Sequence, residues 1–150
     1  MADTEQFKDH FVLLCEAGFI AVNQADEDAA SKLFKASELL NPENTLPKVG
    51  RGYMHLMKLE LKDSCRLFEE VLAKEPDNEM AKTFLGLSYS LTTTEVEKGE
   101  GLLKQAAKKS DDPQVKKLAD TTLDFVEKFV KKAPTPLESP PEEKKKEKNE

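Results

Sequence analysis

The feature that most constrains the fold of this chain is an internal repeat with a period of 34 residues. The segment KLFKASELLNPEN at 32–44 aligns with RLFEEVLAKEPDN at 66–78. The alignment superposes four identical pairs: Leu33 with Leu67, Phe34 with Phe68, Pro42 with Pro76, and Asn44 with Asn78. The same period relates three glycines, Gly18, Gly52 and Gly86. A repeat of this length is typical of stacked supersecondary units that bury their apolar faces against one another.

The repeat resembles the tetratricopeptide (TPR) family. In that family each unit of about 34 residues is a helix pair with small, apolar and proline residues at fixed positions. The resemblance places one repeat at 11–44, a second at 45–78, a degenerate third at 79–110 and a capping helix at 112–132. It implies an all-α fold, a right-handed α-α superhelix of about three helix pairs plus the C-terminal capping helix.

Local signals predict where the helices begin and end. A first helix is expected over about 5–23, and Asp26 is placed to cap the second. The second helix should end before Asn41-Pro42, because a residue that precedes proline avoids the helical region. Pro47 is expected in the first turn of the third helix, and the fourth helix is expected over about 63–74. Asn78 or Asp77 should cap the fifth helix, and Thr94 with Glu97 forms a capping-box pattern for the sixth. Asp112-Pro113 marks the start of the last helix.

The end of the chain differs in composition from the rest. Residues 133–150 read APTPLESPPEEKKKEKNE, which contains one leucine and no aromatic residue. Such a segment buries too little apolar surface to offset its ordering entropy. We therefore expect a TPR-like helical domain over 1–132 and a disordered Pro/Lys/Glu-rich tail over 133–150.

Composition narrows the classes of partner. The chain has 23 Lys and Arg against 29 Asp and Glu, a net charge of −6. Because a phosphate-backbone binder needs a basic face, we expect no nucleic acid partner. No apolar run approaches the roughly 18 residues that span a bilayer, so no stable membrane insertion is expected. The acidic start MADTEQFKDH lacks the positive charge of a secretory signal, which predicts a cytoplasmic protein.

The TPR resemblance also implies a binding surface. In such stacks the first helix of each pair lines a concave groove. The candidate partner-binding residues are Val12, Cys15, Phe19, Leu46, Val49, Tyr53, Leu56, Met80, Thr83 and Leu87. Some TPR proteins bind the C-terminal carboxylate of a peptide with Lys, Asn and Arg residues of the groove. None of these residue types occurs at the equivalent positions of this chain. The predicted groove is apolar and suits an amphipathic helix with anchors at i, i+3, i+4 and i+7. For Val12 and Leu56, taken singly, ordinary core packing is as well supported as a place in the groove.

The usual constellations of catalytic and metal-binding residues are missing from the sequence. His10 and His55 have no Cys or His at metal-ligand spacing. Adjacent Glu69 and Glu70 point in different directions on a helix, which excludes a catalytic dyad. The glycines near Gly101 follow no strand, so they do not form a phosphate loop. We expect no enzyme, no cofactor and no metal.

A second resemblance lies in the stretch GLLKQAAKKSDDPQVKKLADTTLDFVEKF at 101–129. A short helix, a Ser-Asp-Asp-Pro stop and a closing helix after three small TPR-like units are similar to the small cytosolic chaperones of bacterial type III secretion. The resemblance is greatest to the needle-subunit chaperones. It implies a chaperone whose concave groove binds an amphipathic helix of the needle subunit and prevents premature polymerisation in the cytoplasm. Members of that family often carry a second small helical co-chaperone on their other side.

Two other functions remain open. The chain is also consistent with a chaperone of another export-apparatus or translocator component. A non-chaperone TPR adaptor that joins two folded proteins is an alternative of a different class. An assay with purified client separates chaperone from adaptor, because only a chaperone keeps the client monomeric.

Overall fold

A computed structural model describes residues 5–131, which are all-helical and contain no strand within that range. A 3-10 segment, η1 (Glu5–His10), leads into the first α-helix, and a π-helical turn, η2 (Val126–Val130), follows the last. The α-helices are α1 (Phe11–Asn23), α2 (Glu27–Leu40), α3 (Leu46–Met57), α4 (Leu61–Lys74), α5 (Glu79–Ser90), α6 (Val96–Lys109) and α7 (Pro113–Phe125).

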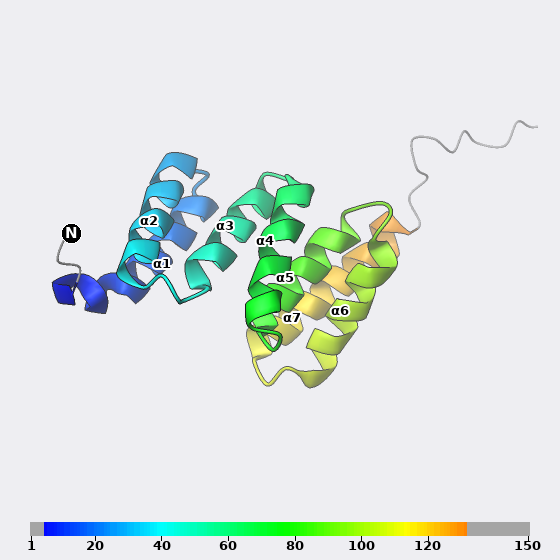
Figure 1. Cartoon of the computed structure of the whole chain (residues 1–150). Helices are drawn as coiled ribbons and strands as arrows, with labels where there is room; N and C mark the ends of the chain where they lie inside the picture. The colour runs from blue at the N-terminus through cyan, green and yellow to red at the C-terminus, as the bar shows by residue number, and fades with distance from the viewer. Residues whose placement is uncertain (1–4, 132–150) are drawn as a thin grey trace, which may run out of the picture.

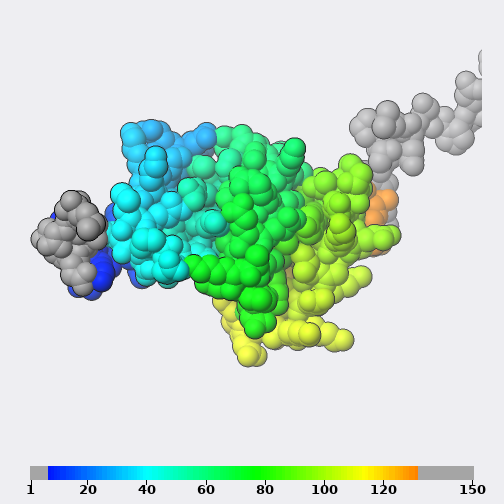
Figure 2. Space-filling model, viewed as in Figure 1, coloured from blue at the N-terminus to red at the C-terminus, as the bar shows by residue number. Residues whose placement is uncertain are grey.

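The helices form successive pairs that follow one another along the molecule (Figure 1). Within each pair, α1 packs on α2, α3 on α4 and α5 on α6, while α7 packs on both α5 and α6. The odd-numbered helices α1, α3, α5 and α7 also contact one another in order and make an inner row. In the space-filling view the colours run in order from blue through cyan to green along the molecule, and yellow residues near the turn between α6 and α7 lie beneath the green ones (Figure 2). Each unit therefore packs mainly against its neighbours in sequence.

Close approach between a helix backbone and an aromatic ring joins the first two pairs. A Cβ atom added to Gly18 of α1 would lie 2.5 Å from the ring of Phe34 on α2, and one added to Gly50 of α3 would lie 2.2 Å from the same ring. Phe34 is 0% exposed. The second pair repeats the contact between Gly18 and Phe34: a Cβ atom added to Gly52 of α3 would lie 2.7 Å from the ring of Phe68 on α4. Glycine is required here because any side chain would overlap the ring.

The 34-residue period is also visible in the turns. Ala25 and Leu59, one period apart, both adopt a φ of 58°. In both turns the N–H of the next residue donates a 2.9 Å hydrogen bond to the carbonyl five residues earlier. The bonds run from Asp26 to Ala21 and from Glu60 to His55. The turn between α5 and α6 is longer and spans 91–95, so α6 begins one residue later than a strict repeat would place it. As a result Gly86 packs against Leu103, which replaces the aromatic ring in the third pair.

Three of the predicted helix caps are confirmed. Each is an acidic or amide side chain that accepts a hydrogen bond from a backbone N–H in the first helical turn. The bonds are Ala29 N–H to Asp26 at 3.0 Å, Ala81 N–H to Asn78 at 2.9 Å, and Gln114 N–H to Asp112 at 2.8 Å. The choice between Asn78 and Asp77 is thus decided in favour of Asn78.

Other boundaries differ from the prediction. The α-helix expected from about residue 5 begins only at Phe11, after the 3-10 segment, and α4 begins at Leu61 rather than near Asp63. The capping box of Thr94 and Glu97 is wrong, because the N-cap of α6 is Glu95 and its side chain makes no capping bond. The longer turn at 91–95 moves the helix start past Thr94. The tail predicted over 133–150 lies outside the described residues.

The apolar interior consists of three clusters in chain order. The first surrounds Phe34 and includes Met54 of α3, the second surrounds Phe68 between α3, α4 and α5, and the third surrounds Leu103 between α6 and α7. A search of the described helices finds none with the length and apolar character needed to cross a membrane.

We expect Phe34→Ala to lower the free energy of unfolding by about 3–5 kcal/mol, because the ring is fully buried and the glycines on both sides cannot fill the cavity. Chemical denaturation followed by circular dichroism measures the change. Leu39→Ala on the same helix is the matched control, since Leu39 is 69% exposed and its truncation should leave stability nearly unchanged. Equal stability of the two variants would contradict this packing.

Candidate functional site

A row of three aromatic rings crosses the inner helices, with one ring from each of α1, α3 and α5. The ring centroids of Phe19 and Tyr53 are 5.8 Å apart, and those of Tyr53 and Phe84 are 5.1 Å apart. All three side chains are half-buried, so each ring keeps part of its surface accessible. We call these three residues the aromatic row.

Two core rings support the aromatic row from below. Phe19 meets the buried Phe34 edge-on, with centroids 5.5 Å apart. Phe84 contacts the buried Phe68 at 5.6 Å. Offset and edge-to-face contacts of this kind add about 0.5–1.5 kcal/mol each beyond the area that they bury. The row is therefore held in place by the same rings that join the helix pairs.

Tyr53 gives the row one polar point. Its hydroxyl donates a 2.7 Å hydrogen bond to Oδ1 of Asn23 at the end of α1. Burial raises the pKa of Tyr53 above its ordinary value of 10.0, so the hydroxyl stays protonated at neutral pH. This bond ties α3 to α1 and limits rotation of the ring.

The structure divides the ten predicted groove residues into two groups. Six keep accessible surface: Val12 and Met80, which are 56% and 42% exposed, and the half-buried Phe19, Leu46, Tyr53 and Leu87. The other four are buried and belong to the core rather than to a surface: Cys15, Val49, Leu56 and Thr83.

The contacts of these buried residues lie inside the molecule. Val49 and Leu56 pack in the cluster around Phe68. The Thr83 hydroxyl donates a 2.8 Å hydrogen bond to the carbonyl of Glu79, one turn earlier on α5. This bond satisfies the hydroxyl without any contact from a bound ligand. Val49 and Leu56 thus lie beneath the surface, between α3, α4 and α5.

Phe84 was not among the predicted residues, although it is central to the aromatic row. It stands one period after Gly50, at a repeat position that the predicted groove left out. The sequence does carry a signal for Phe84, because an aromatic residue stands there where the preceding repeat has Gly50. At Gly50 the backbone meets the ring of Phe34, whereas Phe84 supplies a ring of its own.

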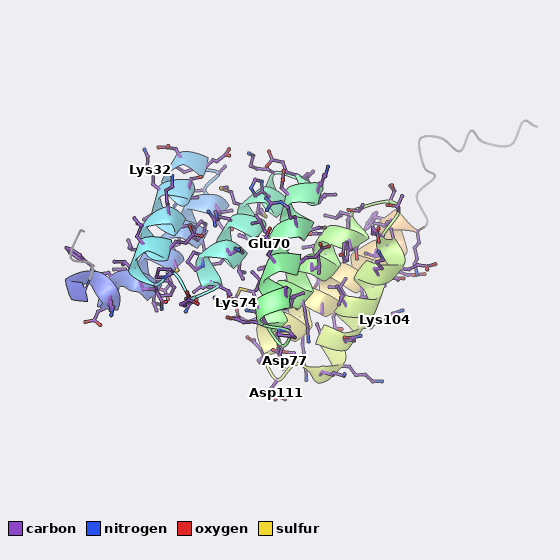
Figure 3. All side chains as sticks on the ribbon, viewed as in Figure 1. Lys32, Glu70, Lys74, Asp77, Lys104 and Asp111 are labelled. Atoms are coloured by element: carbon purple, nitrogen blue, oxygen red, sulfur yellow. The ribbon has the colours of Figure 1, made fainter. Side chains whose placement is uncertain are left out.

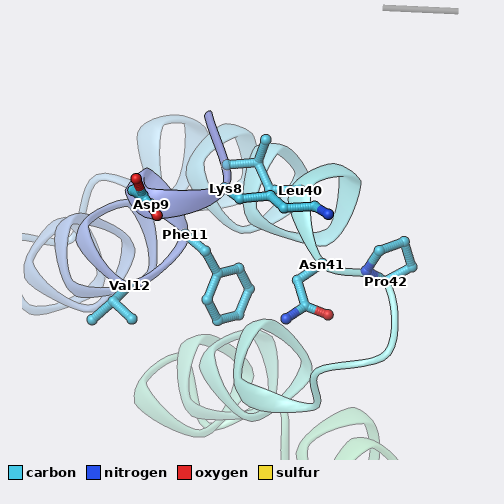
Figure 4. Close-up of a pocket in the computed structure, with 7 residues that line it drawn as sticks. All are labelled: Lys8, Asp9, Phe11, Val12, Leu40, Asn41 and Pro42. Carbon is cyan, nitrogen blue, oxygen red and sulfur yellow. The ribbon is translucent and has the colours of Figure 1, made fainter. Parts of the chain in front are cut away.

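A hollow of about 680 Å³ lies at the N-terminal end of the stack, where η1, α1 and the turn after α2 meet (Figure 4). Its lining mixes charged and apolar side chains: Lys8, Asp9, Phe11, Val12, Leu40, Asn41 and Pro42. Val12 thus borders this hollow as well as facing solvent.

One cluster of metal-ligand types is present that the sequence spacing did not suggest. Ligand atoms of His55, Glu60 and Asp63 lie within 4.8 Å of one another. Glu60 is already engaged, because Nζ of Lys58 lies 2.8 Å from one oxygen and Nδ1 of His55 lies 2.5 Å from the other. Lys58 and then His55 hold the pKa of Glu60 below its ordinary value. The arrangement is an ion-pair network at the turn between α3 and α4.

No family model, no curated protein and no solved structure matches this chain. The geometry of its surface therefore carries the functional inference. The aromatic row offers partly accessible apolar surface in an ordered arrangement across three helices.

The reactivity of Cys15 tests whether this residue belongs to the core. Its thiol is 0% exposed and burial raises its pKa, so in a Cys65→Ser variant we expect it to react with a disulfide reagent at pH 8 only through unfolding. A Val12→Cys variant with both native cysteines changed to alanine is the control, and should react at least about 100-fold faster. Similar rates would place Cys15 in an open groove after all.

Proposed function

We propose that this chain is a TPR-like binding protein that holds an amphipathic helix of a self-assembling client across the aromatic row of Phe19, Tyr53 and Phe84. The row is the single observation that carries the proposal. Three half-buried rings on the inner helices α1, α3 and α5 contact one another in a row, and grouped apolar side chains at a surface commonly mark a binding site. Aromatic residues are also the side chains that most often dominate binding energy.

The ring spacing fits a helical ligand. Neighbouring rings are 5.8 and 5.1 Å apart, and side chains at i and i+3 or i+4 on a helix are about 5–6 Å apart. A helix with an apolar stripe can therefore place one anchor beside each ring in turn. A ligand in the extended conformation repeats its side chains on one face every 6–7 Å or so, which fits the row less well.

Within this class we propose a chaperone of bacterial type III secretion, with the needle subunit as client. The mechanism is stoichiometric. The chaperone occupies the helix by which the client would join a filament, and mass action keeps the client monomeric as long as the complex is tighter than the filament contacts. The action takes place in the cytoplasm before export, and a second small helical co-chaperone is compatible with it.

The test of function uses the full chain co-expressed with a needle subunit. We expect a soluble complex that stays in the supernatant on sedimentation, whereas the needle subunit alone forms filaments that pellet. A complex that forms while the client still polymerises would support the adaptor function instead. Absence of any complex would remove the needle subunit as client.

The test of the binding face uses single substitutions. We expect Tyr53→Ala and Phe84→Ala each to weaken client binding by more than about tenfold, because central aromatic anchors cost roughly 2 kcal/mol or more on truncation. Tyr53→Phe keeps the ring and should retain binding, and Leu39→Ala, an exposed apolar residue on α2, is the control. Melting temperatures are measured in parallel, so that a variant that merely unfolds is recognised. Unchanged affinity in folded Tyr53→Ala protein would show that the client binds elsewhere.

A further inference from the structure

A small apolar hollow lies beside the aromatic row, between the C-terminal ends of α1 and α3. The outer helices α2, α4 and α6 expose charged side chains, of which Figure 3 labels Lys32, Glu70 and Lys104. The hollow has a different character. It measures about 200 Å³ and is lined by four apolar residues, Val22, Ala25, Met54 and Met57, together with Asn23, Glu27 and Lys58. We call this space the methionine hollow.

The methionine hollow continues the aromatic row by one helical turn. Asn23 follows Phe19 by four residues on α1, and Met57 follows Tyr53 by four residues on α3. Residues four apart lie on the same face of a helix. The hydrogen bond from the Tyr53 hydroxyl to Asn23 joins the row to the lining of the hollow. A ligand helix that lies across Phe19 and Tyr53 therefore passes within one helical turn, about 5 Å, of the hollow.

The internal repeat shows which kind of side chain belongs in such a space. Leu61 stands one period after Glu27, and Leu91 stands one period after Met57. Both leucines pack against the cluster around Phe68. The contact between the second and third helix pairs thus contains two leucines of the chain itself. At the equivalent positions of the first two pairs, Met57 stays 55% exposed and Glu27 is engaged in an ion pair, so the aliphatic group is missing there.

The size and chemistry of the methionine hollow fit one aliphatic side chain. An apolar cavity of about 150 Å³ can hold a benzene molecule, so a hollow of about 200 Å³ has room for a side chain of leucine size. Val22 and Met54 are only 6% and 7% exposed, and methionine side chains adapt to irregular shapes. The charges of the lining are matched, because Nζ of Lys58 lies 2.8 Å from Glu27. The hollow therefore favours an uncharged apolar group.

We propose that the methionine hollow takes one aliphatic side chain, of the size of leucine, from the client helix that lies on the aromatic row. This inference rests on the function proposed above and adds a determinant of specificity to it. The contact is separate from those beside the rings, because it lies between α1 and α3 one turn closer to their C-terminal ends. A client with alanine at this position loses the contact, and one with a charged residue would have to bury that charge in apolar surroundings.

A first experiment tests the methionine hollow without a client. The full chain is labelled with [methyl-¹³C]methionine and titrated with N-acetyl-leucinamide. We expect the methyl resonances of Met54 and Met57 to shift saturably, with an affinity in the millimolar range that is usual for so small a ligand, while the resonance of Met80 on α5 stays in place. N-acetyl-glycinamide, which lacks the side chain, should shift none of them. In an Ala25→Leu variant the shifts should disappear, because the new side chain fills the hollow.

The repeat supplies the reason to expect that Ala25→Leu folds. Ala25 and Leu59 share a φ of 58°, so a leucine already adopts this backbone conformation one period later. Met57→Gln is a second variant, which keeps the length of an exposed side chain and makes the lining polar. Leu59→Ala is the matched control, since Leu59 is 68% exposed and lies outside the lining. Circular dichroism melting curves verify that each variant is folded.

A second experiment measures the affinity of the same variants for the needle subunit. We expect Ala25→Leu to weaken binding about tenfold, because a leucine of the client loses its buried site, and Met57→Gln about threefold. Leu59→Ala should change the affinity by less than about twofold. Loss of affinity in folded Tyr53→Ala protein but not in Ala25→Leu protein would overturn the hollow as a subsite and leave the proposed function intact.

The two experiments separate a failure of the hollow from a failure of the proposed function. If the wild-type chain does not bind the needle subunit, the proposed function is wrong and the methionine spectra decide about the hollow. A saturable shift that Ala25→Leu abolishes would retain the hollow as the site for an aliphatic side chain of another helical ligand. Absence of that shift, or an equal shift with N-acetyl-glycinamide or in Ala25→Leu protein, would overturn the inference.

Discussion

The approach of two helix backbones to one aromatic ring is the contact on which the arrangement of the first two helix pairs depends. Phe34 fills the space between α1 and α3 only because Gly18 and Gly50 have no side chains. A methyl group at either position would force the helices apart, since buried atoms have little room to move. The distance between α1 and α3 sets the distance between the Phe19 and Tyr53 rings. The geometry of the candidate binding surface is thus a consequence of packing in the core.

The sequence predicts well those features that repeat and less well those that depend on how closely successive helix pairs pack. The period linking Phe34 to Phe68 reflects a contact made twice, so helix positions and the caps at Asp26 and Asn78 follow from it. Whether a residue on an inner helix is covered depends on how closely successive pairs pack. No spacing within one repeat encodes that distance, which is why Cys15 was expected at the surface and lies in the core.

The two sides of α3, in the middle helix pair, carry different kinds of contact. Tyr53 on α3 stacks between aromatic rings, while Arg51 on the same helix lies in a seam of ion pairs. Ion pairs that are about one-third exposed add little stability, typically under 1 kcal/mol. At the position of Arg51 the other two repeats carry the apolar residues Ala17 and Leu85. The pair of Arg51 and Glu38 thus joins α2 to α3 by a contact that adds little to stability.

The aromatic row has a structural role in addition to the binding role proposed for it. Phe19 packs on the cluster around Phe34 and Phe84 on the cluster around Phe68, so Tyr53 between them connects two parts of the core. A ligand that covers the row removes these rings from water and reinforces that connection. Because it binds the folded chain and not the unfolded one, it raises stability by RT ln(1 + [L]/Kd). The surface proposed for client binding is therefore also the surface through which a bound client would stabilise the helix stack.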